Sequence, residues 1–260
     1  DGGATYGQMA KLTASDAAAG VNFGYSVAIA GSTVVVGTYY GEAAYVFLTT
    51  DDGATYGQVA KLTASDAATN DRFGISVAID GATVVVGAYA NYRTAGAAYI
   101  FRTTDGTTYG QVAKLTAADP AMMDVFGYSV AIDGATVVVG AHYDDDAGSD
   151  SGSAYVFLDT WPAPTPQPTH LPTQRTSSWP QLAKMVASDA AAGDYFGRSV
   201  AASGDLVAVG AYGDDDGGTN SGSVYILRMD SSAAGYTQLV KLTASDASAG
   251  DFFGYYVAID

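Results

Sequence analysis

The sequence contains no cysteine, only two histidines and no apolar run long enough to cross a bilayer. The absence of cysteine excludes disulfides and thiolate metal sites and leaves the compartment open. His142 follows a predicted strand, and His170 lies in a proline-rich segment. A catalytic triad or a histidine metal site would need further converging groups, which the sequence does not indicate. We therefore expect a protein that is not an enzyme.

Basic residues are also scarce, with 11 Lys and Arg against 27 Asp and Glu and a net charge of −16. An acidic surface repels nucleic acid and anionic lipid, so we expect neither nucleic-acid binding nor membrane insertion of this segment. The hydrophobic content of 48% is enough for a real core. The 32 glycines favour many turns and small β units over long helices.

The chain is built from a repeated unit that is marked by Phe-Gly. Phe-Gly recurs at spacings of 50, 53, 70 and 57 residues, with an Asp seven residues before each Phe and a Lys five residues before each Asp. Spacing this constant indicates one structural unit per copy. The five Phe-Gly elements begin at Phe23, Phe73, Phe126, Phe196 and Phe253.

Each full unit contains four runs with strand character. The run after Phe-Gly alternates, as in Ile75 to Ile79, which is typical of a half-buried strand. The next run, Thr83 to Ala88, has three consecutive valines and is predicted to be buried on both faces. The third run, Ala98 to Arg102, alternates again, and the fourth, Gln111 to Thr116, carries the Lys expected on an outer edge strand.

Short turns join these runs, including Asp80-Gly81 between the first and the second. The unit is thus a four-stranded antiparallel meander of about fifty residues, a length typical of a propeller blade. We predict an all-β propeller with four full blades and partial blades at both ends. The partial blades comprise a strand at Tyr6 to Thr13 and another at Tyr255 to Ile259. Residues 1–260 are interpreted as one domain, a fragment of a larger ring.

A proline-rich segment, Trp161 to Pro180, interrupts the third unit between its third and fourth runs. Proline cannot donate to a strand ladder, so we expect an extended insertion within a blade. A flexible surface loop is one interpretation. A ligand for a proline-recognition module and an O-glycosylated tract are the others.

These residues resemble a known family. Phe-Gly, Ser-Val-Ala-Ile, Val-Val-Val-Gly-Ala and Gly-Ser-Ala-Tyr-Val-Phe in succession are similar to the FG-GAP repeat of integrin α-subunit propellers and of secreted microbial and algal proteins. The resemblance implies an extracellular or cell-surface location. Integrin-type copies place a calcium loop between the first two strands, but here that connection is a short turn, so the integrin site does not carry over.

The loop between the second and third runs is the best candidate for a metal site, because hard cations such as calcium require several oxygen ligands on a bendable loop. It is acidic in the third and fourth units only, since the first has Gly41-Glu42 and the second has residues 90–93. The alternative is a solvated acidic turn. The candidate ligands are Asp144, Asp145, Asp146, Asp150, Asp214, Asp215, Asp216 and Asn220.

The approach to Phe-Gly holds a second acidic pattern, in which two Asp lie five residues apart, as at Asp66 and Asp71. We interpret the constant Asp as a structural residue that caps the loop backbone, with a metal ligand as the alternative. The other copies are Asp119 with Asp124, Asp189 with Asp194 and Asp246 with Asp251, while Asp16 has Val21 opposite.

These patterns are consistent with three functions. The first is an extracellular binding or scaffold module that presents loops to a protein or glycan, with calcium as a possible cofactor. The second is a noncatalytic propeller attached to a larger secreted or membrane-anchored hydrolase, and the third is an enzyme. Tyrosines at strand ends favour the first, since Tyr provides contact area at low entropic cost. They are Tyr39, Tyr40, Tyr89, Tyr92, Tyr143 and Tyr212.

Overall fold

The structure is a computed structural model that describes residues 7–89, 94–160, 178–230 and 235–260. Its sixteen strands form four sheets of four, and the described residues contain no helix able to span a membrane. The first sheet consists of β1 Phe23–Ala30, β2 Thr33–Thr38, β3 Ala44–Leu48 and β4 Gly57–Leu62. The second consists of β5 Ser76–Asp80, β6 Thr83–Ala88, β7 Ala97–Thr103 and β8 Tyr109–Leu115. The third consists of β9 Ser129–Asp133, β10 Thr136–Ala141, β11 Ser153–Leu158 and β12 Gln181–Met185. The fourth consists of β13 Phe196–Ser203, β14 Leu206–Ala211, β15 Ser223–Asp230 and β16 Gly235–Leu242.

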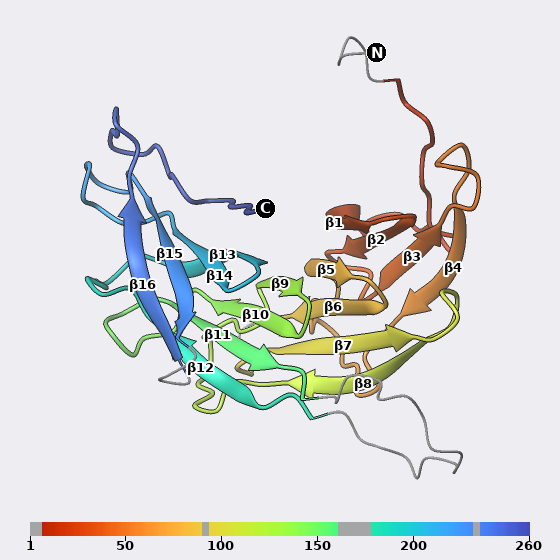
Figure 1. Ribbon diagram of the computed structural model, residues 1–260, viewed down its shortest axis with the longest axis horizontal. Helices are drawn as coiled ribbons and strands as arrows, with labels where there is room; N and C mark the ends of the chain where they lie inside the picture. Colours follow the sequence, from red (N-terminus) through yellow and green to blue (C-terminus); the bar gives the residue numbers. More distant parts are fainter. Residues whose placement is uncertain (1–6, 90–93, 161–177, 231–234) are drawn as a thin grey trace.

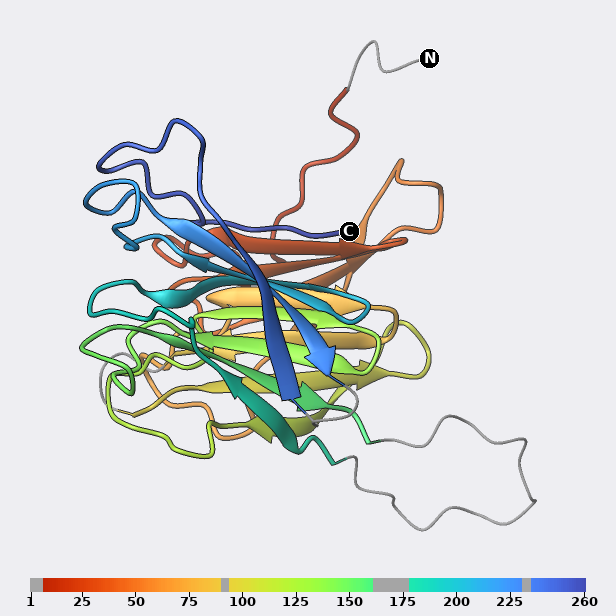
Figure 2. The same cartoon turned by 60° about the vertical axis from the view of Figure 1, so that its left-hand side comes forward.

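Every sheet is an antiparallel meander in which neighbours in sequence are neighbours in space. Figure 1 shows the four sheets fanned around a common centre as an open arc, with β1, β5, β9 and β13 innermost. Figure 2 shows the same sheets stacked on one another. The predicted all-β propeller of four full blades is confirmed, and β6 and β10 have the bounds that the valine runs predicted.

The core lies between the sheets. Both faces of β6 and β10 are buried, as expected for strands with no polar face. The third run was predicted to alternate, but β7 and β11 are buried almost throughout. Sequence alternation was misleading because a middle strand of each blade is covered on both faces by the adjacent blades.

The Phe-Gly element joins one blade to the previous one. Phe126 packs edge-on against Tyr155 and Phe157 of its own sheet. Gly127 adopts a φ of 93°, which a residue with a side chain rarely adopts. Its carbonyl accepts a hydrogen bond of 3.0 Å from the Ser76 hydroxyl of the preceding sheet. The same bond recurs as Ser26 to Gly74, Ser129 to Gly197 and Ser199 to Gly254.

The two end segments differ from the prediction. Residues 7–13 and the segment from Tyr255 to Ile259 contain no strand. The last copy keeps only an isolated bridge between Gly222 and Phe253. A strand requires a hydrogen-bonded neighbour, and within the described ranges no strand forms a ladder with either segment.

The proline-rich segment lies mostly outside the described residues, together with His170. The described flanks meet, because the Thr160 amide donates to the Ser178 carbonyl at 3.1 Å. The fourth strand resumes at Gln181, as the sequence predicted.

Candidate functional site

The acidic loop of the third sheet encloses a lysine of the same sheet. Lys184 on β12 forms ion pairs with Asp119 at 2.8 Å, with Asp144 at 2.9 Å and with Asp146. Asp144 is 2% exposed and also accepts hydrogen bonds from Ser153 and Tyr155, both at 2.9 Å. The chain thus supplies both the positive charge and the donors that this buried carboxylate needs.

The fourth sheet repeats the arrangement. The carboxylate oxygens of Asp189, Asp214 and Asp216 lie within 4.8 Å of one another, which is close enough to ligate one metal ion. The Lys241 ammonium lies 2.6–2.8 Å from all three. Burial raises the pKa of Asp214, but hydrogen bonds, led by that from Lys241, outweigh it and leave the pKa below its usual value.

The remaining loop candidates shape the turn. The Asp145 carboxylate accepts the Asp150 amide at 2.7 Å, and the Asp215 carboxylate accepts the Asn220 amide at 2.6 Å. Asp150 and Asn220 both adopt positive φ values, 53° and 54°. These pairs are Asx-type turns in which carboxylates satisfy local backbone. Calcium binding by the eight loop residues stays a prediction.

The paired Asp residues before Phe-Gly have separate roles. Asp71 accepts the Ala68 amide at 2.9 Å, so the second Asp of the pair is the one that caps the loop backbone. Asp66, which we expected to be the cap, instead contacts the Lys114 ammonium at 2.5 Å and the Tyr99 hydroxyl at 3.0 Å. Sequence spacing revealed that both positions matter but could not assign their partners, because the lysine is 48 residues away.

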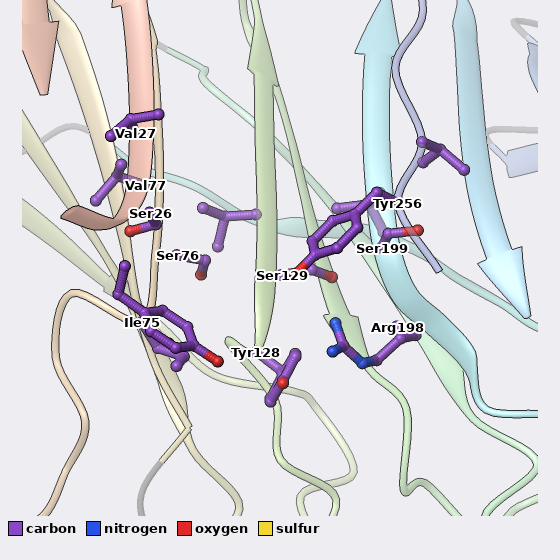
Figure 3. Close-up of a pocket in the computed structure, with 14 residues that line it drawn as sticks. Ser26, Val27, Ile75, Ser76, Val77, Tyr128, Ser129, Arg198, Ser199 and Tyr256 are labelled. Atoms are coloured by element: carbon purple, nitrogen blue, oxygen red, sulfur yellow. The ribbon is translucent and has the colours of Figure 1, made fainter. Parts of the chain in front are cut away.

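A cavity of about 360 Å³, which we call the channel, lies between the four innermost strands. Each strand contributes a Ser-Val pair from the Ser-Val-Ala repeat, and Figure 3 shows these side chains around the opening. Tyr128, Arg198 and Tyr256 lie at one side of it, with the Arg198 guanidinium directed toward both tyrosines (Figure 3).

A second cavity of about 230 Å³ shares Tyr128 and Arg198 with the first. We call it the tyrosine cup. Side chains that follow the second strand of each sheet meet there with those that open the inner strands, so all four blades contribute. The lining residues are Tyr39, Tyr89, Val125, Tyr128, His142, Tyr143, Arg198, Tyr212 and Tyr255.

The tyrosines hold one another in the cup. The hydroxyls of Tyr39 and Tyr89 lie 3.2 Å apart. The ring of Tyr212 packs against that of Tyr255 at 5.3 Å between centroids and stacks on Tyr195 at 4.9 Å. Aromatic pairs at these separations are attractive, so the cup is already formed without a ligand.

Arg198 is the charged member of the cup. Its guanidinium lies over the rings of Tyr255 at 4.1 Å and Tyr128 at 4.4 Å. The residue is 8% exposed, and among the described residues no carboxylate pairs with it. His142, also buried, contacts Tyr128 and Tyr143, and its Nδ1 has no hydrogen-bond partner within the described ranges. Burial, aided by the charge of Arg198, lowers the pKa of His142 to about 3.

Sequence reasoning identified most of the tyrosines but did not assign to the cup the two polar residues that break the repeat. The position after Phe-Gly is Tyr25, Ile75, Tyr128, Arg198 and Tyr255 in the five copies, and the position after the second strand is Tyr39, Tyr89, His142 and Tyr212. Arg198 and His142 are the polar departures and lie in the cup, whereas Ile75 is an apolar departure that lines the channel. Aligning the copies column by column would have found them. Tyr92, another predicted contributor, lies outside the described residues.

Comparison with known proteins addresses the fold and the family. No curated protein matches the chain. Among solved structures, the computationally designed Ika4 protein matches at 14% identity and a TM-score of 0.49, over 87% of this chain and all of its own. The family described as the FG-GAP repeat matches residues 6–56, 56–101, 109–157, 179–227 and 236–260.

These matches cover most of the sequence and follow the Phe-Gly periodicity of the four sheets. FG-GAP repeats generally form non-catalytic binding propellers and are typical of extracellular and surface proteins. The chain belongs to the FG-GAP repeat family.

Proposed function

We propose that this chain is a non-catalytic extracellular or cell-surface module that binds a protein or glycan ligand in the tyrosine cup. The observation that carries the proposal is the convergence of tyrosines from all four blades around a preformed concave site. Tyrosine offers flat contact area and a hydroxyl while losing little side-chain entropy on binding. The accessible lining is mainly polar, and Arg198 and the tyrosine hydroxyls are the convergent polar groups that orient a ligand in such a site.

The surroundings of the cup support binding over chemistry. His142 is held neutral by burial, and no carboxylate or second histidine lines the described cup or the adjoining channel. A nucleophile with an adjacent base, the arrangement that covalent catalysis needs, is therefore missing from these two cavities. The hypothesis that the propeller accompanies a larger hydrolase stays a prediction, and a ligand-binding cup would serve that arrangement equally well.

A glycan and protein binding screen tests the proposal, with the wild-type chain compared with Tyr212→Ala and Tyr56→Ala. Tyr212 lines the cup, whereas Tyr56 lies outside it, beside the turn between β3 and β4. We expect ligands that bind the wild type and Tyr56→Ala but bind Tyr212→Ala at least tenfold more weakly. If the wild type binds nothing in the screen, or if its ligands bind Tyr212→Ala equally well, the cup is not the binding site.

A further inference from the structure

The guanidinium of Arg198 has hydrogen-bonding capacity that the protein does not use. Stacking on Tyr128 and Tyr255 engages the faces of the guanidinium and leaves its N–H groups at the edge. A guanidinium carries five such donors, and the described residues accept no hydrogen bond from them. The Arg198 nitrogens are not sealed from solvent, so a ligand that brings an anionic acceptor can replace their hydrogen bonds to water with a charge-assisted bond.

Among the described residues, no acid lines the two cavities that Arg198 shares. The channel is lined by Ser, Val, Tyr, Ile and Arg side chains, and the cup by Tyr, Val, His and Arg. This contrasts with a chain whose net charge is −16 and whose lysines are paired with Asp in every sheet. Arg198 is thus a local positive centre on an acidic molecule.

The other titratable groups of the cup leave this charge unaltered. His142 is neutral near pH 7 and adds no second positive charge. Burial raises the pKa of Tyr212 to about 12 and also raises that of Tyr128, so both hydroxyls stay protonated near pH 7. Arg198 is the one cation that lines the cup, while Arg72 lies over the Tyr39 ring at 4.8 Å without lining it. One lining cation matches one anionic group, and the planar fork of Arg matches a carboxylate in a bidentate manner.

The size and walls of the cup limit what carries the anion. Its volume of about 230 Å³ is below the roughly 300–1,000 Å³ of pockets for drug-sized ligands, so a single compact group fits. The accessible lining of the cup is mainly polar, so its tyrosine hydroxyls suit a ring with peripheral hydroxyls. The surrounding acidic molecule disfavours ligands with several negative charges.

We propose that the tyrosine cup binds a sugar ring that bears one carboxylate, with Arg198 receiving the carboxylate and the tyrosine hydroxyls contacting the sugar hydroxyls. This inference rests on the proposed function and specifies its ligand class. Arg198 is the specificity-determining residue, and it distinguishes the fourth blade from the blades that place Tyr25 and Tyr128 at the same position of the repeat.

Calorimetric titration with glucuronate and glucose tests the proposal, since these sugars share a ring and differ at the carboxylate. We expect wild-type protein to bind glucuronate at least tenfold more tightly than glucose, with a shift of the Arg198 Nε–Hε signal in NMR spectra. Arg198→Tyr restores the residue of the neighbouring blade, so it should fold, and it should lose the preference. Arg228→Gln is the control, because Arg228 is exposed and lies outside both cavities.

Each alternative result has a distinct meaning. Equal binding of both sugars, absence of glucuronate binding, or a preference that survives Arg198→Tyr overturns the inference. Acetate or a glutamate-containing peptide that binds as tightly as glucuronate also overturns it, because the sugar ring would then contribute nothing. In each case, a ligand from the screen whose binding depends on Tyr212 still supports the proposed function. If the chain binds neither glucuronate nor any such ligand, both the inference and the proposed function are contradicted.

Discussion

The second and third sheets come from nearly the same repeat, yet they hold their outer lysine differently. Lys114 is 41% exposed and pairs with one carboxylate, that of Asp66. Lys184 is 18% exposed and is surrounded by three, including the buried Asp144. The acidic loop between β10 and β11 makes this difference, because it adds Asp144 and Asp146 above a lysine that both sheets possess.

The acidic loop changes the energetic role of a lysine that recurs in every sheet. In the second sheet the ion pair is solvated, and such pairs contribute little to stability. In the third sheet the lysine neutralises an acid that lies inside the protein, and removal of one partner from a buried pair leaves the other uncompensated. The fourth sheet, with Lys241 and Asp214, behaves like the third.

The largest expected effect comes from replacing Lys184, with the same replacement of Lys114 as the comparison. Lys184→Met should destabilise the protein by about 3–5 kcal/mol, because Asp144 is left buried without its partner. Lys114→Met, the matched control, should cost only about 0.2–1 kcal/mol. Urea denaturation of both variants measures the difference, and equal losses would show that the acidic loop does not bury its ion pair.

Removal of the tyrosine hydroxyl tests the same contrast at smaller scale. The Tyr155 hydroxyl lies within 3.1 Å of Asp119 and 2.9 Å of Asp144, whereas the Tyr99 hydroxyl contacts Asp66 alone. Tyr155→Phe should cost about 1.5–3 kcal/mol, the range for hydrogen bonds to charged groups, and Tyr99→Phe should cost less because Asp66 is solvated. A reversed order in thermal melts would contradict the comparison.

The loop also affects Asp124, the acid that caps the turn before Phe126. Burial, with a contribution from Asp144, raises the pKa of Asp124 to about 6. A raised carboxyl pKa means that stability is present below the unfolded value near 3.8 and is lost as pH rises through 6. Asp124→Asn should therefore gain about 1 kcal/mol relative to wild type between pH 4 and pH 7.5, since one pKa unit corresponds to ~1.4 kcal/mol and solvent screens part of the shift.

The control for this prediction is Asp71→Asn in the second sheet. Asp71 caps the equivalent turn by accepting the Ala68 amide, without an acidic loop above it. Melting temperatures across the same pH range should show a pH-dependent gain for Asp124→Asn and no such gain for Asp71→Asn. Parallel curves for the two variants would mean that Asp144 does not influence the turn.

The smallest expected effect concerns calcium. The Lys184 ammonium occupies the position between the carboxylates where a cation would lie, so we expect the wild-type melting temperature to be the same in chelator and in millimolar calcium. Lys184→Met should regain stability in calcium, because three carboxylates are then left for the ion. A calcium-dependent rise in the wild type would instead support ligation by the loops with the lysine in place.

Several parts of this molecule followed from local chemistry. The valine runs predicted β6 and β10 to the residue, and the short turns predicted antiparallel neighbours. The acidic loops were recognised by composition, but Lys184 was interpreted only as an edge-strand charge. Its partners could not be predicted, since Asp119 and Asp144 are 65 and 40 residues away and meet it only after the sheet has formed.

The sequence alone determined the blade, because a Phe-Gly element, an alternating run, a valine run and tight turns specify a four-stranded meander through local periodicity and turn geometry. The tertiary structure decided what the blades do together. Arg198 and His142 are 56 residues apart and unremarkable singly, and the radial arrangement of the sheets places them in one cup. Such a site cannot be predicted from any one repeat, because its lining side chains come from all four blades and from the segment after Phe253.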